Sequence, residues 1–411
     1  MSELEHLIYD WNVHGREPFH PKRPILLDDE TLRDGLQSPS VLDPDLDHKI
    51  RLIHLMDQLG ISTADIGLPG AGQRQREDIT RLAKEVADNR LNIGINVACR
   101  TIVSDLEPVV EISQKAGLPI EIAAFIGSSE IRQYTESWDL KLLLDRSREA
   151  LEFAQKNNLP VVYVTEDTTR AHPQTVQALY SQAVELGAKR VCVSDTVGHS
   201  DPYGAFNVVQ FVKHVLQGLG VEEEVGIDWH GHRDRGLALA NCIAAVEAGA
   251  TRIHGAALGI GERTGNAPMD LLLVNFVLLG WLDHDIRALP EYVHTVAEAV
   301  GVRVPYNYPV LGSDAFVTGT GVHAAAVIKA LRRGDRELAD AVYSGVPAAI
   351  VGKEQVIGVG PMSGRSNVQW ELERLQRDPS DANIAKVLGR AKLSKELLTD
   401  AEILEALDGA K

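Results

Sequence analysis

The feature of this sequence that most limits its fold is a regular alternation of short, β-branched apolar runs with longer amphipathic segments. The runs lie at residues 25–28, 61–67, 91–97, 120–126, 160–165, 190–194, 225–229 and 251–255. Between them, apolar residues recur at spacings of three and four, the period of a helix that buries one face. Eight strand–helix units predict an α/β fold of the (β/α)8 TIM-barrel type. A doubly wound open sheet would alternate in the same way, but no Gly-x-Gly-x-x-Gly motif follows the first run.

Local signals for helix ends support the alternation. Pro173 and Pro202 stand where a first helical turn is predicted, and proline is favoured there because its missing N–H is not needed. Ser104-x-x-Glu107 and Thr399-x-x-Glu402 have the spacing of a capping box. We therefore predict that helices begin at these four places.

Polar residues cluster immediately after the predicted strands. In TIM barrels the active site is built from these strand ends and the loops that follow them. A single residue of this kind is commonly a turn former, but the coincidence of many at one end of a barrel indicates an active site. The set comprises Arg33, Asp34, Asp65, Arg100, Glu166, Thr196, His230, His232 and the loop 259–266.

His230 and His232 form the most specific part of this set. Side chains two positions apart on a strand share one face, so both imidazoles can reach a single ion. Asp34 follows the first strand, which lies near the seventh and eighth strands in a closed barrel, and can supply a third ligand. Two nitrogens and a carboxylate leave coordination positions open, as in catalytic sites for zinc, manganese or magnesium. The structural alternative is a pair of loop histidines that bind no ion.

Composition narrows the possible partners. The formal net charge of −17 argues against a surface for nucleic acid or an anionic membrane. The three cysteines are widely spaced and fit neither a disulfide framework nor a zinc knuckle. No charged and apolar signal segment stands at the start, and the longest apolar stretch, at about 271–282, is too short to span a bilayer. We expect a cytoplasmic protein that binds neither nucleic acid nor membranes.

Four motifs resemble those of a known superfamily: TLRDGLQ at 31–37, SDTVGHSDP at 194–202, HGHRDRGLALAN at 230–241 and GIGERTGNAP at 259–268. The chain is similar to the DRE-TIM metallolyases, and within them to the Claisen-condensing branch of 2-isopropylmalate, citramalate and homocitrate synthases. The likeness continues beyond the barrel, through Gly321-Val322-His323 and Ser363-Gly364-Arg365. Motifs in the same order along the chain make the resemblance specific for the family, but not for the substrate.

The resemblance implies a role for each matching residue. Asp34, His230 and His232 would hold a divalent metal ion (manganese, magnesium or zinc), with Asn266 as a fourth ligand or near-ligand. The ion and Arg33 would stabilise the negative charge that develops on the keto oxygen of a 2-oxo acid. Other residues at the strand ends would contact the substrates, namely Gln37, Asp65, Arg100, Arg132, Glu166 and Thr196.

The second substrate that the resemblance implies is acetyl-CoA, whose methyl group must lose a proton. In the family this involves a histidine donated by a neighbouring subunit. His323 matches that histidine, with Glu262 and Tyr343 as assisting residues. Without the resemblance, a histidine beside a Gly-rich loop would be read as a turn residue. The resemblance therefore implies a homodimer with shared active sites.

The acceptor acid is less sharply indicated than the reaction. Homocitrate synthases have an arginine at the position of Val162 that binds the distal carboxylate of 2-oxoglutarate, whereas the SSxxR pattern at 128–132 is of the homocitrate type. Asp65 and Arg233 stand where the family usually has Glu and Asn. We expect a short aliphatic acceptor, 2-oxoisovalerate, which would place the enzyme in leucine biosynthesis as a 2-isopropylmalate synthase. Homocitrate or citramalate synthase activity is the alternative.

Two further functional classes are alternatives to a synthase. A 3-hydroxy-3-methylglutaryl-CoA lyase shares the RDGLQ motif at 33–37, but such lyases carry a catalytic cysteine after the eighth strand, and residues 256–266 contain none. A non-catalytic regulator built on the same barrel need not retain Arg33, Asp34 and the two histidines. The synthase is therefore the preferred prediction.

The expected organisation has four segments: an N-terminal arm at 1–24, a TIM-barrel catalytic domain at 25–285, a helical linker subdomain at 286–370 and a helical subdomain at 371–411. The last two form a mainly helical C-terminal extension. The extension is too short for the regulatory domain of leucine-inhibited synthases, so we expect none of that type.

Overall fold

The computed structural model describes residue 4 and residues 6–15 and 17–408. The ends of the expected arm and tail, residues 1–3 and 409–411, lie outside the described residues, as do residues 5 and 16. The chain divides into two compact units. One is Pro18–Arg303, and the other combines Met1–Glu17 with Val304–Lys411.

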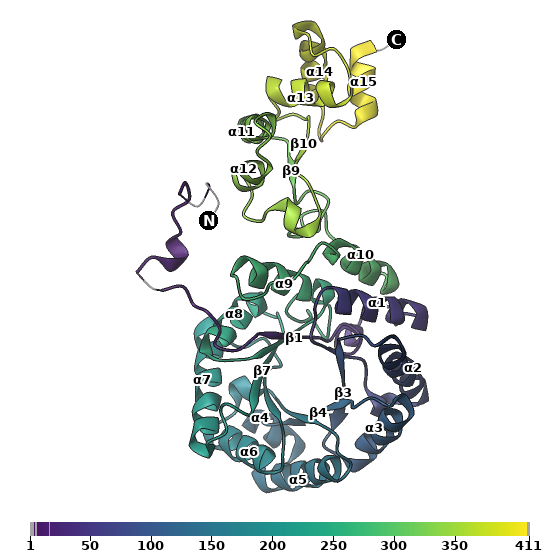
Figure 1. Cartoon of the computed structure of the whole chain (residues 1–411), viewed down its shortest axis with the longest axis vertical. Helices are drawn as coiled ribbons and strands as arrows, with labels where there is room; N and C mark the ends of the chain where they lie inside the picture. The colour runs from purple at the N-terminus through teal and green to yellow at the C-terminus, as the bar shows by residue number, and fades with distance from the viewer. Residues whose placement is uncertain (1–3, 5, 16, 409–411) are drawn as a thin grey trace. The chain divides into compact units, whose positions relative to one another are not determined.

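The larger unit is a closed barrel of eight parallel strands in sequential order, and β8 completes the ring by pairing with β1. Figure 1 shows helices surrounding these strands. The predicted TIM barrel is confirmed, and the open-sheet alternative is wrong because closure leaves no unpaired edge strand. The strands are β1 Leu26–Asp29, β2 Thr63–Asp65, β3 Gly94–Arg100, β4 Glu121–Gly127, β5 Val161–Glu166, β6 Arg190–Asp195, β7 Gly226–Gly231 and β8 Arg252–Gly255.

Helices follow the strands along the chain and bury their apolar faces against the barrel. Their apolar spacing of three and four predicted this arrangement. They are α1 Leu46–Gln58, α2 Gln73–Asn89, α3 Val103–Ala116, α4 Glu130–Glu136, α5 Leu140–Lys156, α6 Pro173–Glu185, α7 Pro202–Leu219, α8 Ala238–Ala248, α9 Met269–Leu278 and α10 Leu289–Ala299.

The helix starts test the local signals read from the sequence. α6 and α7 begin at Pro173 and Pro202, as predicted. α3 begins at Val103, and its N-cap Ile102 makes no side-chain capping hydrogen bond. The capping box predicted at Ser104 is therefore wrong, because Ser104 already lies inside the first turn.

α10 belongs to the barrel unit through a buried polar contact. The Tyr292 hydroxyl donates a hydrogen bond to the Asp29 carboxylate at the end of β1 and lies 3.2 Å from Thr31 Oγ1. Tyr292 and Asp29 are both fully buried. The domain boundary expected at residue 285 thus falls inside the barrel unit, which runs to Arg303.

The second unit is mainly helical, as predicted. Thr399 and Glu402 form the expected capping box, with each backbone N–H bonded by the other side chain. A short parallel pair, β9 Val317–Thr318 and β10 Val356–Ile357, joins the helices. No helix in the described ranges is long and apolar enough to cross a bilayer. The helices are α11 Gly321–Arg332, α12 Arg336–Ala341, α13 Arg365–Arg374, α14 Asp381–Leu393 and α15 Asp400–Asp408.

Candidate metal centre and active site

Three adjacent strands bring the candidate metal ligands together. β8 pairs with β1 on one side and with β7 on the other. His230 lies on β7, His232 directly follows it, and Asp34 follows β1. Because the strands are parallel, their carboxyl ends meet at one end of the barrel. All three side chains are buried there.

The ligating atoms of these residues converge. His230 Nε2 and His232 Nε2 lie 3.2 Å apart, and Asp34 Oδ2 lies 3.8 Å from the first and 3.7 Å from the second. Burial and the neighbouring His230 lower the pKa of His232 to about 4, so this imidazole is neutral near pH 7 and can offer a lone pair. Two imidazole nitrogens and one carboxylate oxygen facing the same point are a donor set that fits a divalent ion with open coordination positions.

Asp34 stays ionised although it is buried. Burial alone raises the pKa of Asp34, but the positive charge of the adjacent Arg33 guanidinium is the largest opposing cause, and the pKa is held below its ordinary value. Asp34 Oδ1 accepts a hydrogen bond from Asn266 Nδ2 at 2.9 Å, whereas Oδ2 faces the histidines. Oδ2 also accepts a hydrogen bond from Arg33 Nη1 at 3.1 Å, and its remaining lone pair can be offered to a cation beside the histidines.

Asn266 supports this carboxylate through its amide nitrogen. Its Nδ2 also donates to the Ile260 carbonyl at 3.1 Å. Its Oδ1 is buried and makes no hydrogen bond within the described residues. The amide nitrogen therefore braces Asp34, and coordination of the ion by the amide oxygen stays a prediction.

Glycines in the loop after β8 allow Asn266 to approach Asp34. Gly265 has φ +98°, and a Cβ there would lie 1.8 Å from the Gly259 carbonyl oxygen. Gly261 has φ +149°, and its Cβ would lie 2.1 Å from Asn266 Nδ2. Only glycine fits such close approaches, so these two residues position the brace.

Arg33 is held on three sides. Its Nη2 lies 2.9 Å from Glu30 Oε1, its Nη1 3.1 Å from Asp34 Oδ2 and its Nε 2.7 Å from Asp65 Oδ2. These contacts fix the planar guanidinium at the wall of a cavity. Asp65 does not line this cavity and holds Arg33, so its expected contact with the substrate stays a prediction.

The cavity lies at the strand ends and encloses about 190 Å³. Among the expected site residues, Gln37, Glu166, Thr196 and Glu262 line it beside the metal-ligand group. Burial raises the pKa of Glu166 above its ordinary value. The apolar part of the lining consists of Leu68, Ala98, Ala123, Phe125 and Val164.

Two further expected substrate contacts, besides Asp65, do not line the cavity. Arg100 is mostly exposed and its Nε lies 2.7 Å from Asp105 Oδ2. Arg132 pairs with Glu136 at 3.1 Å and is half-exposed. Both side chains are thus engaged by their own loops or helices, and their contact with a substrate stays a prediction.

His323 and Tyr343 belong to the C-terminal unit. His323 lies in the first turn of α11, and its ring stacks on Tyr343 with centroids 4.3 Å apart and planes inclined by 30°. The structure thus brings together two of the three residues that the resemblance assigned to proton removal. Their role at a barrel site stays a proposal.

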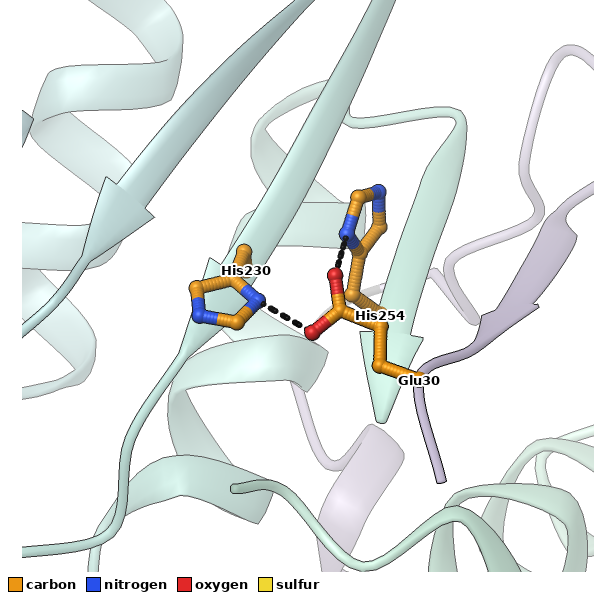
Figure 2. A group of neighbouring side chains, drawn as sticks. All are labelled: Glu30, His230 and His254. Carbon is orange, nitrogen blue, oxygen red and sulfur yellow. Dashed lines mark hydrogen bonds and ion pairs between the residues drawn. The ribbon is translucent and has the colours of Figure 1, made fainter. Parts of the chain in front are cut away.

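Reasoning from the sequence missed the residues behind His230. Glu30 lies between two imidazoles, with Oε2 3.0 Å from His230 Nδ1 and Oε1 2.8 Å from His254 Nδ1 (Figure 2). All three side chains are buried. A signal was present: Asp28 and Glu30, like Arg252 and His254, are polar residues two positions apart at a strand, where they share a face.

A protein-family model described as HMGL-like matches residues 24–296. The match spans more than half of the chain and contains every barrel strand and every candidate metal ligand. The chain belongs to the HMGL-like family. The family resemblance predicted from the motifs is thereby confirmed.

Within the HMGL-like family the chain is similar to synthases of Methanopyrus kandleri. It is 31% identical to a putative (R)-citramalate synthase, over 90% of this chain and 69% of that one. It is 32% identical to a homocitrate synthase (90% and 87%) and 29% identical to a probable 2-isopropylmalate synthase (89% and 68%). The three names differ in the product that each enzyme makes, so similarity alone does not select one.

Solved structures of other proteins share the barrel. An HMG-CoA lyase from Bacillus subtilis superposes with a TM-score of 0.57 over 70% of this chain and 97% of that one, at 20% identity. At this level of identity the likeness shows the fold.

Proposed function

We propose that this protein is a metal-dependent synthase that condenses acetyl-CoA with a 2-oxo acid to give a 2-alkylmalate and free CoA, with 2-oxoisovalerate as the preferred acceptor. The observation that carries the proposal is the convergence of Asp34, His230 and His232 beside Arg33 in a buried cavity. Relatives at 29–32% identity that are named as synthases support the reaction class.

In this reaction a base removes a proton from the methyl group of acetyl-CoA, and the resulting carbon attacks the keto carbon of the acid. The keto oxygen takes up negative charge and is then protonated, and water hydrolyses the thioester so that CoA leaves as a thiol. A divalent ion at the three ligands would supply Lewis-acid polarisation of the keto group. Arg33, whose fork is already fixed by carboxylates, would stabilise the same developing charge.

Other lining residues have hydrogen-bonding capacity that suits a carboxylate substrate. Thr196 Oγ1 accepts a hydrogen bond from the Asp167 N–H at 2.8 Å, so its hydroxyl proton can donate to a ligand. Gln37 carries two further amide donors at the cavity wall. We assign these two residues to the carboxylate of the 2-oxo acid. Proton removal from acetyl-CoA is assigned to His323, assisted by Glu262 and Tyr343.

The lining of the cavity supports an aliphatic acceptor. The arginine that lines it is Arg33, which already pairs with three carboxylates. No unpaired arginine or lysine stands among its lining residues in the described chain. The distal carboxylate of 2-oxoglutarate would lose hydration without gaining a partner. A branched alkyl group would instead gain ~25 cal/mol for each Å² buried against the apolar side chains.

The test is a panel of 2-oxo acids with the metal-loaded protein and acetyl-CoA, read by free thiol release and by the mass of the product. We expect the highest kcat/KM with 2-oxoisovalerate, and no release with the His230→Ala variant. A preference for pyruvate or 2-oxoglutarate would replace the acceptor with that of a citramalate or homocitrate synthase. Thiol release that no 2-oxo acid stimulates would overturn the condensation itself.

A further inference from the structure

We propose that Glu30 is a positioning residue for His230: its carboxylate holds the Nδ1–H of that imidazole, so that Nε2 keeps its lone pair for the metal ion. The inference rests on the proposed metal site and deepens it. It concerns a residue that the family resemblance left without a role, and it explains why a carboxylate is buried directly behind a metal ligand.

The contact between Glu30 and His230 determines where the imidazole proton lies. Glu30 Oε2 lies 3.0 Å from His230 Nδ1 in an ion-pair contact, and this buried oxygen has no hydrogen-bond partner in the described residues. A carboxylate oxygen carries only lone pairs, so this approach is attractive only if Nδ1 carries hydrogen. In a neutral imidazole the lone pair is then on Nε2, the atom that faces His232 and Asp34.

A buried chain of charged groups holds Glu30 in turn. His254 Nδ1 donates to Glu30 Oε1 at 2.8 Å, and His254 Nε2 donates to Asp228 Oδ2 at 3.1 Å. Asp228 also accepts from Arg252 Nε at 2.7 Å and from Arg190 Nε at 2.5 Å. Because both oxygens of Asp228 accept hydrogen bonds and Glu30 Oε1 contacts both His254 and Arg33, rotation of either carboxylate would leave a buried charge without a partner.

The strands place this row of charged side chains inside the barrel. Asp228 and His230 lie two residues apart on β7, and Arg252 and His254 two apart on β8, so each pair shares a face. Barrel interiors are usually filled by branched apolar side chains. Buried ion pairs are weak contributors to stability compared with apolar packing of the same volume, so stability alone does not account for these buried charged side chains. Orientation of the metal ligand His230 does account for them.

A second metal ion between Glu30, His230 and His254 is the competing explanation, since their atoms lie close enough. The distances argue against it. The two imidazole nitrogens contact different oxygens of one carboxylate at hydrogen-bond length, 3.0 and 2.8 Å, instead of facing a common point. An ion there would also require His230 to ligate through both of its nitrogens.

The first measurement uses the wild-type protein without metal, labelled with ¹⁵N-histidine. Two-bond ¹H–¹⁵N spectra report which ring nitrogen carries the proton, and the His230 signals are assigned by their loss in His230→Ala. We expect His230 in the Nδ1–H form at neutral pH. A predominant Nε2–H form would overturn the proposal, and this result does not depend on the folding of any Glu30 variant.

The second measurement compares variants. In Glu30→Gln one of the two carboxylate oxygens is replaced by an amide NH₂, which is itself a donor. Placing that NH₂ at the Oε1 position would set it against two donors, Arg33 and His254, whereas the Oε2 position meets only His230. The NH₂ therefore faces His230 Nδ1 and drives the proton to Nε2. We expect zinc or cobalt affinity to fall 10–100-fold, the usual effect of removing an outer partner of a ligand. Glu30→Asp keeps the charge but withdraws the carboxylate by one methylene, and it should lose comparable affinity.

A matched control is Glu121→Gln, which neutralises a partly buried carboxylate that pairs with Arg252 at 2.8 Å and leaves the His230 contact in place. It should leave both the His230 tautomer and the metal affinity unchanged. Unchanged tautomer and affinity in Glu30→Gln would overturn the proposal. So would two bound ions per chain, with one lost in His254→Ala. All these readouts omit acetyl-CoA and 2-oxo acids, so failure of the condensation assay would leave them standing.

Discussion

His230 and His232 are the side chains whose removal tests the metal site most directly. Each contributes an Nε2 atom to the group completed by Asp34. We predict that His230→Ala and His232→Ala bind far less divalent metal and lose condensation activity, because the remaining pair of ligands cannot hold the ion. Metal content is measured after desalting, with circular dichroism to confirm folding. His172→Ala, an exposed histidine that follows β5, is the control. Full metal content in both variants would contradict the assignment.

Substitution of Arg33 distinguishes stabilisation of the developing negative charge from binding of the metal ion. Its guanidinium contacts Asp34 but is not itself a ligand. We predict that Arg33→Ala retains metal and loses at least ~10²-fold in kcat, the typical effect of removing one group that stabilises an oxyanion. Arg33→Lys should recover little, because a point charge cannot contact Glu30, Asp34 and Asp65 as the planar fork does. The test is steady-state kinetics of both variants with metal occupancy measured in parallel. Recovery of kcat in Arg33→Lys would show that a positive charge alone is sufficient for stabilising the developing oxyanion.

Among the structural elements, the loop after β8 is the one whose backbone the site depends on. A Cβ at Gly265 would lie 1.8 Å from the Gly259 carbonyl oxygen, so the loop must open. We predict that Gly265→Ala withdraws Asn266 from Asp34 and weakens metal binding, measured by titration calorimetry. Gly218→Ala is the matched control, because its Cβ on α7 meets no atom within 4 Å. That change should stabilise the protein by ~0.5–1 kcal/mol and leave metal affinity unchanged.

The contact between β1 and α10 predicts a pH dependence of stability. Burial raises the pKa of Asp29 from 3.8 to about 7, although Thr31 and Tyr292 donate hydrogen bonds to it. The folded state therefore holds this proton more tightly than the unfolded state. Its contribution to stability is greatest below pH 4 and is lost as the pH rises to about 7, by on the order of 4 kcal/mol.

Asp29→Asn removes this proton equilibrium. Urea unfolding of both proteins at pH 5, 6 and 7 should show wild-type stability falling relative to the variant as the pH rises. The slope of the difference should approach ~1.4 kcal/mol per pH unit. Parallel pH profiles for the two proteins would mean that Asp29 is ionised in the folded state as it is in the unfolded state.

For the whole molecule, the central proposal is a homodimer in which each active site takes His323 from the partner subunit. His323 belongs to the C-terminal unit, and the metal ligands belong to the barrel unit. We predict that a mixture of His323→Ala and Arg33→Ala subunits regains part of the activity that each variant lacks, since one site of a mixed dimer contains both wild-type groups.

This complementation is measured after subunit exchange, which is verified by mass spectrometry or by differently tagged chains. The control is a mixture of His323→Ala with a His323→Ala, Arg33→Ala double variant, in which no site can be complete. If exchange is demonstrated and the first mixture remains inactive, His323 acts within its own chain or takes no part in the reaction.

Much of the barrel and of the site could be predicted because the signals are local. Helix and strand periods depend on neighbours along the chain, and Pro173, Pro202 and the Thr399 capping box mark real helix starts. The same kind of reasoning failed at Ser104, because α3 begins at Val103, two residues before the first helical position that a cap at Ser104 would give. Local sequence signals predict that a helix or strand is present more reliably than they predict its first and last residues.

The sequence by itself determined the alternating pattern that closes into a barrel, the family, and the motifs that place Arg33, Asp34, His230 and His232 at its strand ends. Only the tertiary structure decided which groups stand behind them. Glu30 and His254 are 224 positions apart in the chain and meet because β8 pairs with β1 in a specific register. Asp65 holds Arg33 for the same reason, from the neighbouring β2. Closure of the ring and strand register are long-range properties, which no local pattern of residues encodes.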